Sequence, residues 1–273
     1  MAIDHVLKLY AETIQSPYLH YGFWDKPQLI DPAKLRLDDI IEAQERYIEH
    51  LSGFIPDDVR LILDVGCGIG GNAGYLIDRG YTVETLSPDT YQEEAIHRRF
   101  NASVPFYRTK FEKFSSPKQY DLILESESAC YIKMGPGFEK AYEVLRPGGY
   151  LLVADYFVHH NDGSQNPHLK ASHNMDEYLR RAKENRFTLI REYDQTENTM
   201  PTLDAARVFV QRFMEPTVEY ALNSLRRKTP KLLTFVKMLF GKRIRKKSAQ
   251  LVLIDSAAFR KYRRYMIYLF QKD

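Results

Sequence analysis

The sequence contains very little cysteine and no long apolar run. Cys67 and Cys130 are its only cysteines, so a fold held by several disulfides is excluded and a reducing, cytoplasmic compartment is favoured. No stretch of roughly 18 apolar residues occurs, so we expect no membrane-spanning helix. The N-terminal stretch carries Asp4 and Glu12 and lacks an apolar core, so we expect no signal peptide.

Acidic residues are absent from one long segment of the chain. Between Tyr220 and Ile254 there is no Asp or Glu, although the net charge of the whole chain is only +3. That segment holds a basic run at residues 226–247. The overall charge is too small to identify a partner, and only its uneven distribution carries information.

Apolar runs alternate with helical patterns through the first part of the chain. The expected strands are 61–66, 81–86, 104–108, 120–126 and 148–157, and the expected helices between them are 71–80, 88–101 and 137–145. Pro88 stands at the first-turn position that proline favours. Alternation of this kind predicts an α/β fold with a doubly wound sheet, whose ligands bind at the carboxyl ends of the strands.

The pattern is looser after Phe157. We expect a loop at 159–168, helices at 175–185, 203–228 and 230–242, and strands at 187–196 and 262–272. Pro216 lies inside the longest of these helices, so we expect a break or kink there.

The glycine-rich stretch LILDVGCGIGG at 61–71 fits two ligand-binding turns. Gly66, Gly68 and Gly71 satisfy the dinucleotide pattern G-x-G-x-x-G, whereas Gly66, Gly68 and Gly70 satisfy G-x-G-x-G. Asp64 would repel a pyrophosphate by a few kcal/mol at an effective dielectric constant of about 20, but it would attract an ammonium group. S-adenosylmethionine carries an ammonium and a sulfonium and no phosphate. A packing turn in an ordinary α/β protein is the alternative.

The string ILDVGCGIGGNAGYL resembles motif I of the class I S-adenosylmethionine-dependent methyltransferases, and YDLILESESACYI and AYEVLRPGGYLLVADYF resemble later motifs of that family. Residues 19–24 (LHYGFW) and 42–51 (EAQERYIEHL) resemble the branch that includes sterol, tocopherol, amine and cyclopropane-lipid methyltransferases. The resemblance covers roughly residues 18–157 and the last strand. It implies a seven-stranded Rossmann-like sheet with N-terminal helices and a helical lid inserted before the last strand.

A single methyltransferase domain with four parts follows from this resemblance. We expect N-terminal lid helices at 1–50, a cofactor-binding core at 51–200, a helical acceptor cap at 201–260 and a final strand at 261–273.

The resemblance also implies a set of cofactor-binding residues. It places Tyr21, Gly22 and Gln44 near the methionine end, beside Asp64, Gly66, Gly68 and Gly70. At the end of the second strand, Thr85, Leu86 and Ser87 stand where many relatives have an acid, and Glu84 should face the other side by strand alternation. Phe111 or Glu112 would meet the adenine, and Glu125 would finish the fourth strand.

Candidates for catalysis are Glu127, His20 and Tyr131. Glu127 and Tyr131 follow the fourth strand and should face the pocket. Tyr131 replaces a histidine of cyclopropane-forming relatives, which favours ordinary methylation. Glu127 could equally be a solvated or structural carboxylate. For His20 we prefer a stacking or capping role in the lid.

Other polar residues receive weaker interpretations. His159 and His160 lie past the fifth strand and are more often surface residues than bases. We expect no metal site, because the histidine and cysteine spacings do not match metal-binding patterns. Cys130 fits a small buried residue. Asp155 and Tyr156 could line the acceptor pocket.

Helices of the expected cap supply an apolar ceiling for the acceptor: Phe209, Phe213, Met214, Tyr220, Phe235, Met238 and Phe240. The basic run at 226–247 has three interpretations. We prefer a roof helix with solvated lysines, next a surface for anionic lipid or a phosphorylated acceptor, and do not expect nucleic-acid binding.

Together these features predict methyl transfer from S-adenosylmethionine to a small, largely apolar acceptor at oxygen, nitrogen or carbon. The acceptor would be lipid-like, prenyl-like or polyketide-like. We expect a cytoplasmic protein, with peripheral membrane association as the alternative, and the oligomeric state stays open. The rival functions are a nicotinamide-dependent oxidoreductase and a non-catalytic protein whose basic surface binds membranes or nucleic acids.

Overall fold

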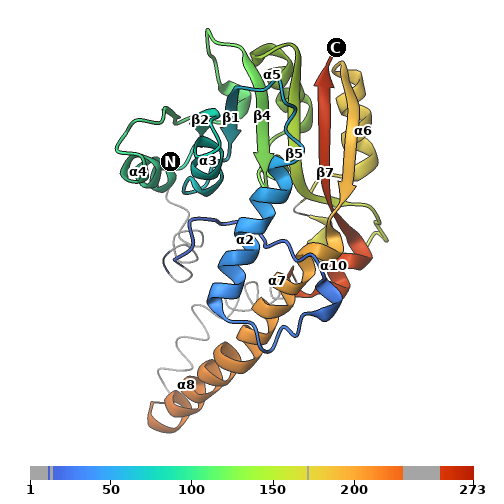
Figure 1. The fold of residues 1–273 in the computed structure, drawn as a ribbon. Helices are drawn as coiled ribbons and strands as arrows, with labels where there is room; N and C mark the ends of the chain where they lie inside the picture. The colour runs from blue at the N-terminus through green and yellow to red at the C-terminus, as the bar shows by residue number, and fades with distance from the viewer. Residues whose placement is uncertain (1–11, 13–14, 171, 230–252) are drawn as a thin grey trace.

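The computed structural model describes residue 12 and residues 15–170, 172–229 and 253–273 (Figure 1). Its sheet has seven strands in the order β3-β2-β1-β4-β5-β7-β6. The strands are β1 (Leu61–Val65), β2 (Thr82–Leu86), β3 (Phe106–Tyr107), β4 (Tyr120–Ser126), β5 (Leu145–Val158), β6 (Phe187–Asp194) and β7 (Arg263–Lys272). The α-helices are α2 (Leu37–Ser52), α3 (Gly71–Ile77), α4 (Thr90–Arg99), α5 (Met134–Val144), α6 (Met175–Glu184), α7 (Thr196–Phe209), α8 (Glu215–Lys228) and α10 (Ser256–Tyr262).

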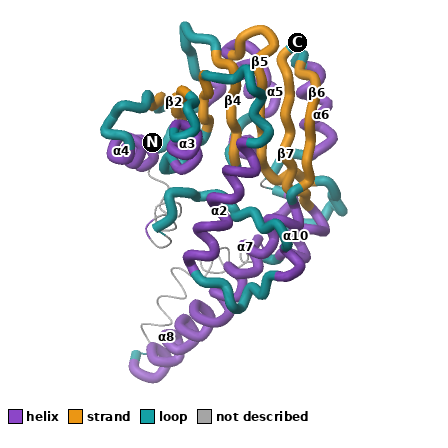
Figure 2. Tube along the Cα trace, in the orientation of Figure 1, coloured by secondary structure: helices purple, strands orange, loops and turns teal. Residues whose placement is uncertain are grey.

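The sheet is parallel from β3 to β5 and becomes antiparallel at β7. β7 enters between β5 and β6, and Tyr156 of β5 lies opposite Tyr265 of β7. This arrangement confirms the expected doubly wound, seven-stranded sheet. The parallel strands end at the edge near α2 and α7, and the arrow of β7 runs the opposite way (Figures 1 and 2).

Both faces of the sheet are buried at its central strands β1, β4 and β5, which explains their continuous apolar runs, whereas the edge strand β6 is exposed after Phe187. Alternate residues of β4 enter different cores: Leu122 and Leu124 pack with α2 and α3, whereas Ile123 packs with α5 and α6. β7 divides in the same way, with Ile267 on the first face and Tyr268 on the second. The period of two along a strand therefore decides which side chains can reach the ligand site.

Several boundaries differ from the sequence-based expectations. α4 begins at Thr90, two residues after Pro88, because the Asp89 side chain caps it by accepting a 3.0 Å hydrogen bond from the Gln92 main-chain nitrogen. β5 begins at Leu145, three residues before the expected start at 148, so it also includes Arg146 and Pro147.

The helical region before the last strand also begins earlier than expected, at Thr196. A π-helical turn at Val210–Met214 separates α7 from α8. Since Pro216 lies in the first turn of α8 and cannot donate a main-chain hydrogen bond, the expected break occurs there as a widened turn. The helix expected at 230–242 lies outside the described residues.

The helices near the ligand edge form a layer below the sheet. α2, α7 and α10 lie at this edge, and α8 extends away from the sheet (Figure 1). Of the helices in the described ranges, none is both long enough and apolar enough to cross a bilayer.

Candidate functional site

The loop that follows β1 can exist only with glycine at several positions. Gly66 has a φ of 75°, in the left-handed region, and a Cβ there would lie 2.4 Å from the Cβ of Ser128. The main-chain nitrogen of Gly66 donates to the carbonyl of Leu86 at 2.8 Å, which fixes the loop to the end of β2. Gly70, with a φ of 86°, is the N-cap of α3. The loop therefore brings main chain directly against the space above the sheet.

A cavity of about 550 Å³ lies over this loop. This volume falls within the range of roughly 300–1,000 Å³ that is typical of small-molecule sites. Of the residues expected at the site, those that line the cavity are His20, Gly66, Gly68, Leu86, Ser87, Phe111, Glu112, Glu127 and Tyr131. Those outside its lining are Tyr21, Gly22, Gln44, Asp64, Gly70, Thr85 and Glu125. Nine of the expected residues therefore lie at one cavity, and seven lie outside its lining.

Asp64 is the penultimate residue of β1 and lies beneath the glycine loop. Its side chain is 1% exposed, and its Oδ2 atom has no hydrogen-bond partner. Burial raises the pKa of Asp64 from 3.8 to about 7. A buried carboxyl group with an unused acceptor is expensive unless something binds it, which marks Asp64 as a functional candidate.

The end of β2 turns its polar residues in two directions. Glu84 faces away from the cavity, where it forms an ion pair with Lys118 and accepts a 2.6 Å hydrogen bond from the Tyr120 hydroxyl. The Thr85 hydroxyl donates to the carbonyl of Pro105 at 2.8 Å. Strand alternation therefore predicted the direction of Glu84 correctly. Thr85 is used for structure, and only Leu86 and Ser87 reach the cavity.

Asp89 is a cavity residue that the sequence analysis missed. It follows Ser87 and Pro88, lines the cavity and caps α4. The signal was available, because an Asp before a helical pattern is a typical N-cap. The expected helix began at Pro88, which placed Asp89 inside the helix and not at its N-cap.

Phe111 and Glu112 form the far wall, at a short 3-10 helix. Phe111 is buried, and an oxygen of Glu112 accepts a hydrogen bond from the Lys133 main-chain nitrogen at 3.2 Å. Both residues line the cavity, and their expected contact with adenine stays a prediction.

Glu127 is held in an unusual backbone conformation just after β4. Its φ is 52°, which is uncommon for a residue with a side chain. One carboxylate oxygen accepts two hydrogen bonds, from the Tyr21 main-chain nitrogen at 2.8 Å and from the Tyr265 hydroxyl at 2.7 Å. Burial raises the pKa of Glu127 to about 7, while these two hydrogen bonds oppose the rise. The carboxylate is thus fixed at the cavity and can gain or lose a proton near neutral pH.

His20 belongs to the wall formed by residues 16–24. Its Nδ1 lies 2.8 Å from the Tyr21 carbonyl and its Nε2 lies 2.9 Å from the side-chain amide of Asn72. Its ring stacks on Tyr47 at a centroid distance of 4.1 Å. Burial lowers the pKa of His20 to about 4, so the ring is neutral at pH 7. Both partner atoms, the Tyr21 carbonyl oxygen and Asn72 Oδ1, are acceptors, and the neutral ring has one N–H to donate to them.

Gln44 fixes this wall from α2. Its side chain donates to the His20 carbonyl at 2.6 Å and accepts from the Ser16 hydroxyl at 2.6 Å. Because Gln44 is fully buried, it holds both ends of the Ser16–His20 segment without touching the cavity.

The next residues of the wall are packed against α2 and α7. A Cβ on Gly22 would lie 2.5 Å from the Cβ of Ala43, so Gly22 permits close packing and does not face the cavity. The indole nitrogen of Trp24 donates to the Thr202 hydroxyl at 3.0 Å. Trp24 therefore reports on contact between this segment and α7.

The remaining candidates near β4 and β5 divide between surface and core. Tyr131 is 81% exposed at the cavity rim. Glu125 faces the opposite side of the sheet from the cavity, and burial raises its pKa to about 8. Asp155 is fully buried and accepts hydrogen bonds from the main-chain nitrogens of Cys130 and Tyr156 at 2.9 and 2.7 Å. Asp155 thus stabilises a turn, and Cys130 lies only partly buried beside it.

Within the described residues of the cap, 201–229 and 253–260, no side chain lines the cavity. The expected ceiling residues in this part, Phe209, Phe213, Met214 and Tyr220, are all at least about half exposed. Phe235, Met238 and Phe240 lie outside the described residues.

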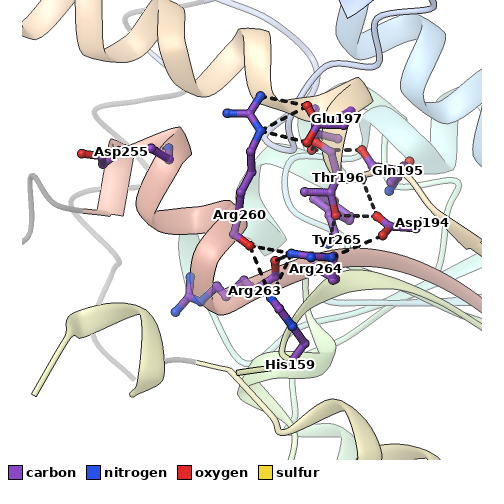
Figure 3. A network of polar contacts seen from close by, with 12 residues as sticks. His159, Asp194, Gln195, Thr196, Glu197, Asp255, Arg260, Arg263, Arg264 and Tyr265 are labelled. Atoms are coloured by element: carbon purple, nitrogen blue, oxygen red, sulfur yellow. Dashed lines mark hydrogen bonds and ion pairs between the residues drawn. The ribbon is translucent and has the colours of Figure 1, made fainter. Parts of the chain in front are cut away.

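His159 lies in a polar network below the sheet (Figure 3). Arg264 contacts its Nε2 at 2.9 Å, and Arg260 forms a two-armed ion pair with Glu197. This network joins α10 to the start of α7, and it gives His159 a structural role. His160 stacks near Tyr262.

Comparison with known proteins agrees with this architecture. Residues 39–205 match the family described as a methyltransferase domain. The methyltransferase GfsG of Streptomyces halstedii is 30% identical over 149 residues, which are 51% of this chain and 51% of that protein. A fatty-acid O-methyltransferase of Mycolicibacterium smegmatis is 30% identical over 150 residues, covering 50% and 52%. The chain therefore aligns with about half the length of each of these curated relatives.

A solved structure shares the fold over nearly the whole chain. Geranyl diphosphate C-methyltransferase from Streptomyces coelicolor superposes with a TM-score of 0.67 and 17% identity, covering 97% of this chain and 93% of that one. Similarity at this level of identity supports the fold alone. Because the family match extends over more than half of the sequence, this chain belongs to the methyltransferase-domain family.

Proposed function

We propose that this protein transfers a methyl group from S-adenosylmethionine to a small, largely apolar acceptor, at oxygen, nitrogen or carbon. The observation that carries the proposal is the cavity above the Gly66–Gly71 loop, with the unpartnered carboxyl of Asp64 beneath it. Membership of the methyltransferase-domain family supports the same reaction.

The polar and apolar groups of the cavity fit the parts of this cofactor. Phe111 and Leu86 offer an apolar surface for the adenine, and Ser87 and Asp89 offer oxygens for the ribose hydroxyls. The main chain at Gly66 and Gly68 can approach the aminoacyl end closely. Asp64 supplies negative charge behind this end and would attract its ammonium group.

The bound cofactor supplies an electrophilic methyl group, and the protein has to place an acceptor in line with it. Positioning alone can contribute much of the rate enhancement. Glu127 is held at the cavity by Tyr21 and Tyr265, so it can orient the acceptor. Where the acceptor carries a proton, Glu127 is the base that we propose, because its pKa of about 7 suits proton transfer near neutral pH.

His20 and Gln44 have positioning roles in this proposal. Both ring nitrogens of His20 are engaged, by Tyr21 and Asn72, which favours the stacking role over a catalytic one. Tyr21, Gly22 and Gln44 would act by holding the wall closed over the cofactor. Tyr131 is exposed at the rim and would meet the acceptor as it enters.

An oxidoreductase with the same glycine turn is less well supported. Asp64 beneath the loop opposes a pyrophosphate, and Glu84, the acid of β2, faces away from the cavity. A binding protein without catalysis would not need Glu127 to be strained and to have its pKa raised to about 7.

For the acceptor we propose a lipid-like, prenyl-like or polyketide-like compound. The similar proteins include a fatty-acid O-methyltransferase and a geranyl diphosphate C-methyltransferase, and fatty acids and geranyl diphosphate are compounds of this kind. We further propose that the basic run at 226–247 meets anionic lipid. Of that run the structure describes residues 226–229, where Arg226, Arg227 and Lys228 are exposed at the end of α8. The cytoplasmic location stays a prediction.

A methylation screen tests the proposal. Purified protein with S-adenosylmethionine carrying a labelled methyl group would be offered fatty acids, prenyl compounds, polyketides, sugars and peptides, with and without anionic vesicles. We expect label only in the apolar classes, and salt-sensitive vesicle binding. Turnover confined to hydrophilic acceptors would contradict the acceptor class, and no turnover in any class would contradict the activity.

A further inference from the structure

Arg263 is a buried cation that the proposed mechanism does not use. It is the first residue of β7 and is only 4% exposed. Its Nε atom donates to the His168 carbonyl at 2.7 Å, but its Nη2 atom has no hydrogen-bond partner. Among the described residues no carboxylate forms an ion pair with it. The buried Asp155 contributes a favourable electrostatic interaction but makes no ion pair with Arg263. A buried guanidinium without a direct anionic partner is unfavourable, so its persistence needs an explanation.

The neighbouring arginines do not share this condition. Arg260 is paired with Glu197 at 2.8 Å, and Arg264 contacts Asp194 at 3.6 Å and His159 at 2.9 Å. Figure 3 shows the Arg263 side chain pointing away from this network. The Nη2 atom of Arg263 is therefore directed away from the ion pairs of Arg260 and Arg264.

Two aromatic rings pack near the Arg263 guanidinium but do not accept hydrogen bonds from its N–H groups in the guanidinium plane. The guanidinium carbon lies 4.8 Å from the ring centre of Tyr156 and 5.9 Å from that of Phe259. Such cation–π contacts are favourable, but a ring face does not replace an oxygen acceptor for the N–H groups in the guanidinium plane. Burial lowers the pKa of Arg263, yet an arginine remains charged in proteins.

Arg263 does not itself line the cavity, but its strand leads to a residue that contacts the cavity wall. Arg263 and Tyr265 lie two residues apart on β7, so their side chains share a face and are about 7 Å apart along the strand. The Tyr265 hydroxyl contacts Glu127 at the cavity wall. The hydroxyl of Tyr156, whose ring faces Arg263, lies 4.0 Å from the sulfur of Cys130, in the loop after β4.

We propose that Arg263 binds a carboxylate group of the acceptor, at the end opposite to the methylated atom. This inference rests on the proposed function. One unpaired guanidinium balances one negative charge, and its two outer nitrogens form the fork that fits a carboxylate. A diphosphate carries more charge than this place can balance, because Arg260 and Arg264 are already paired. The acceptor is thus an apolar carboxylic acid whose acid group is an anchor.

The test compares three proteins saturated with S-adenosylhomocysteine: wild type, Arg263→Met and Arg180→Met. Arg180 is a matched control, because it pairs with Glu177 and Glu184 on the surface of α6. Thermal unfolding would be followed with octanoate, methyl octanoate and methyl phosphate as probes. We expect octanoate to raise the melting temperature of wild type and Arg180→Met, and not that of Arg263→Met.

Each other result contradicts the inference. An equal response to octanoate in all three proteins, or no response in wild type, overturns it. If methyl phosphate raises the melting temperature of wild type more than octanoate does, the choice of a carboxylate is wrong. If methyl octanoate raises it as much as octanoate does, the negative charge of the probe has no role. Without any probe, Arg263→Met should be at least as stable as wild type, because it removes an unpaired buried charge. Loss of S-adenosylhomocysteine binding in wild type would instead refute the proposed function.

Discussion

The hydroxyl of Tyr265 donates a 2.7 Å hydrogen bond to the carboxylate of Glu127. The last strand of the sheet, inserted antiparallel between β5 and β6, thereby holds a residue of the loop after β4. The Tyr265 hydroxyl also lies 2.9 Å from that of Tyr47, which links the pair to α2. Residues of β7 and α2, which are far apart in the sequence, therefore position Glu127, the proposed base.

Tyr265→Phe should move the pH dependence of catalysis. The lost hydrogen bond stabilises the ionised form of Glu127, so its removal raises the pKa above about 7. The acidic limb of kcat/KM should shift upward by about one pH unit, since a hydrogen bond to a charge contributes about 1.5–3 kcal/mol. Glu127→Gln should abolish turnover of a protonated acceptor while leaving S-adenosylhomocysteine binding intact.

Tyr268→Phe is the matched control for this prediction, because Tyr268 lies on the opposite face of the same strand. The pH–rate profiles of wild type, Tyr265→Phe and Tyr268→Phe decide the matter, and only that of Tyr265→Phe should shift. Equal profiles for Tyr265→Phe and wild type would remove Glu127 from the proposed role.

Gly66→Ala should weaken S-adenosylhomocysteine binding more than tenfold, a loss of about 1.4 kcal/mol or more. Gly80→Ala provides the comparison: Gly80 has a φ of 87°, close to the 75° of Gly66, but nothing lies within 4 Å of its missing Cβ. Both variants experience the same backbone strain, and only Gly66→Ala also displaces Ser128 at the cavity. Calorimetric titration that gives similar affinities for the two variants would refute the glycine-loop assignment.

Asp64→Asn should change both stability and the pH dependence of binding. The folded-state pKa of Asp64 lies above its ordinary value, so the native state binds the extra proton and its stability falls as pH rises from 3.8 to about 7. The variant lacks this loss, and its melting temperature relative to wild type should increase across that window.

Binding follows the same titration with the opposite sign. An ammonium group prefers the ionised carboxylate, so the affinity of wild type for S-adenosylhomocysteine should rise between pH 6 and pH 8, around the Asp64 pKa of about 7. Asp64→Asn should bind at least about tenfold more weakly at pH 8 and lose this dependence. An unchanged pH dependence in the variant would show that another group is responsible.

Gln44→Ala should open the wall over the cavity. It removes the bridge between Ser16 and the His20 carbonyl, so proteases should cut within 16–24 faster, even with S-adenosylhomocysteine bound. In wild type, the same ligand should protect this segment and alter the fluorescence of Trp24, which is the only tryptophan. Gln271→Ala, at the far edge near Gly148, is the control and should behave like wild type. Equal cleavage of both variants would contradict a closing wall.

The sequence could predict those features that depend on local pattern. The glycine loop requires positive φ angles, and the apolar runs of β1 and β4 require burial on both faces; both are visible in the residue order. Alternation correctly directed Glu84 away from the cavity. Each of these features depends on residues that are close together in the sequence, so the order of residue types is enough to predict it.

Contacts between distant segments could not be predicted in this way. The Tyr265–Glu127 hydrogen bond, the Asn72–His20 contact and the isolation of Arg263 depend on how β7 and the N-terminal segment pack. The same limit applies to the described ceiling residues Phe209, Phe213, Met214 and Tyr220: the sequence shows that they are apolar, but not that they are exposed and lie away from the cavity.

The most direct test of the account is calorimetric titration of the purified protein with S-adenosylhomocysteine and, separately, with NADH. We predict saturable one-site binding of S-adenosylhomocysteine that Gly66→Ala weakens more than tenfold and Gly80→Ala does not, with no heat from NADH. Binding of NADH that Gly66→Ala abolishes, with no binding of S-adenosylhomocysteine, would contradict the assignment of this cavity to methyl transfer.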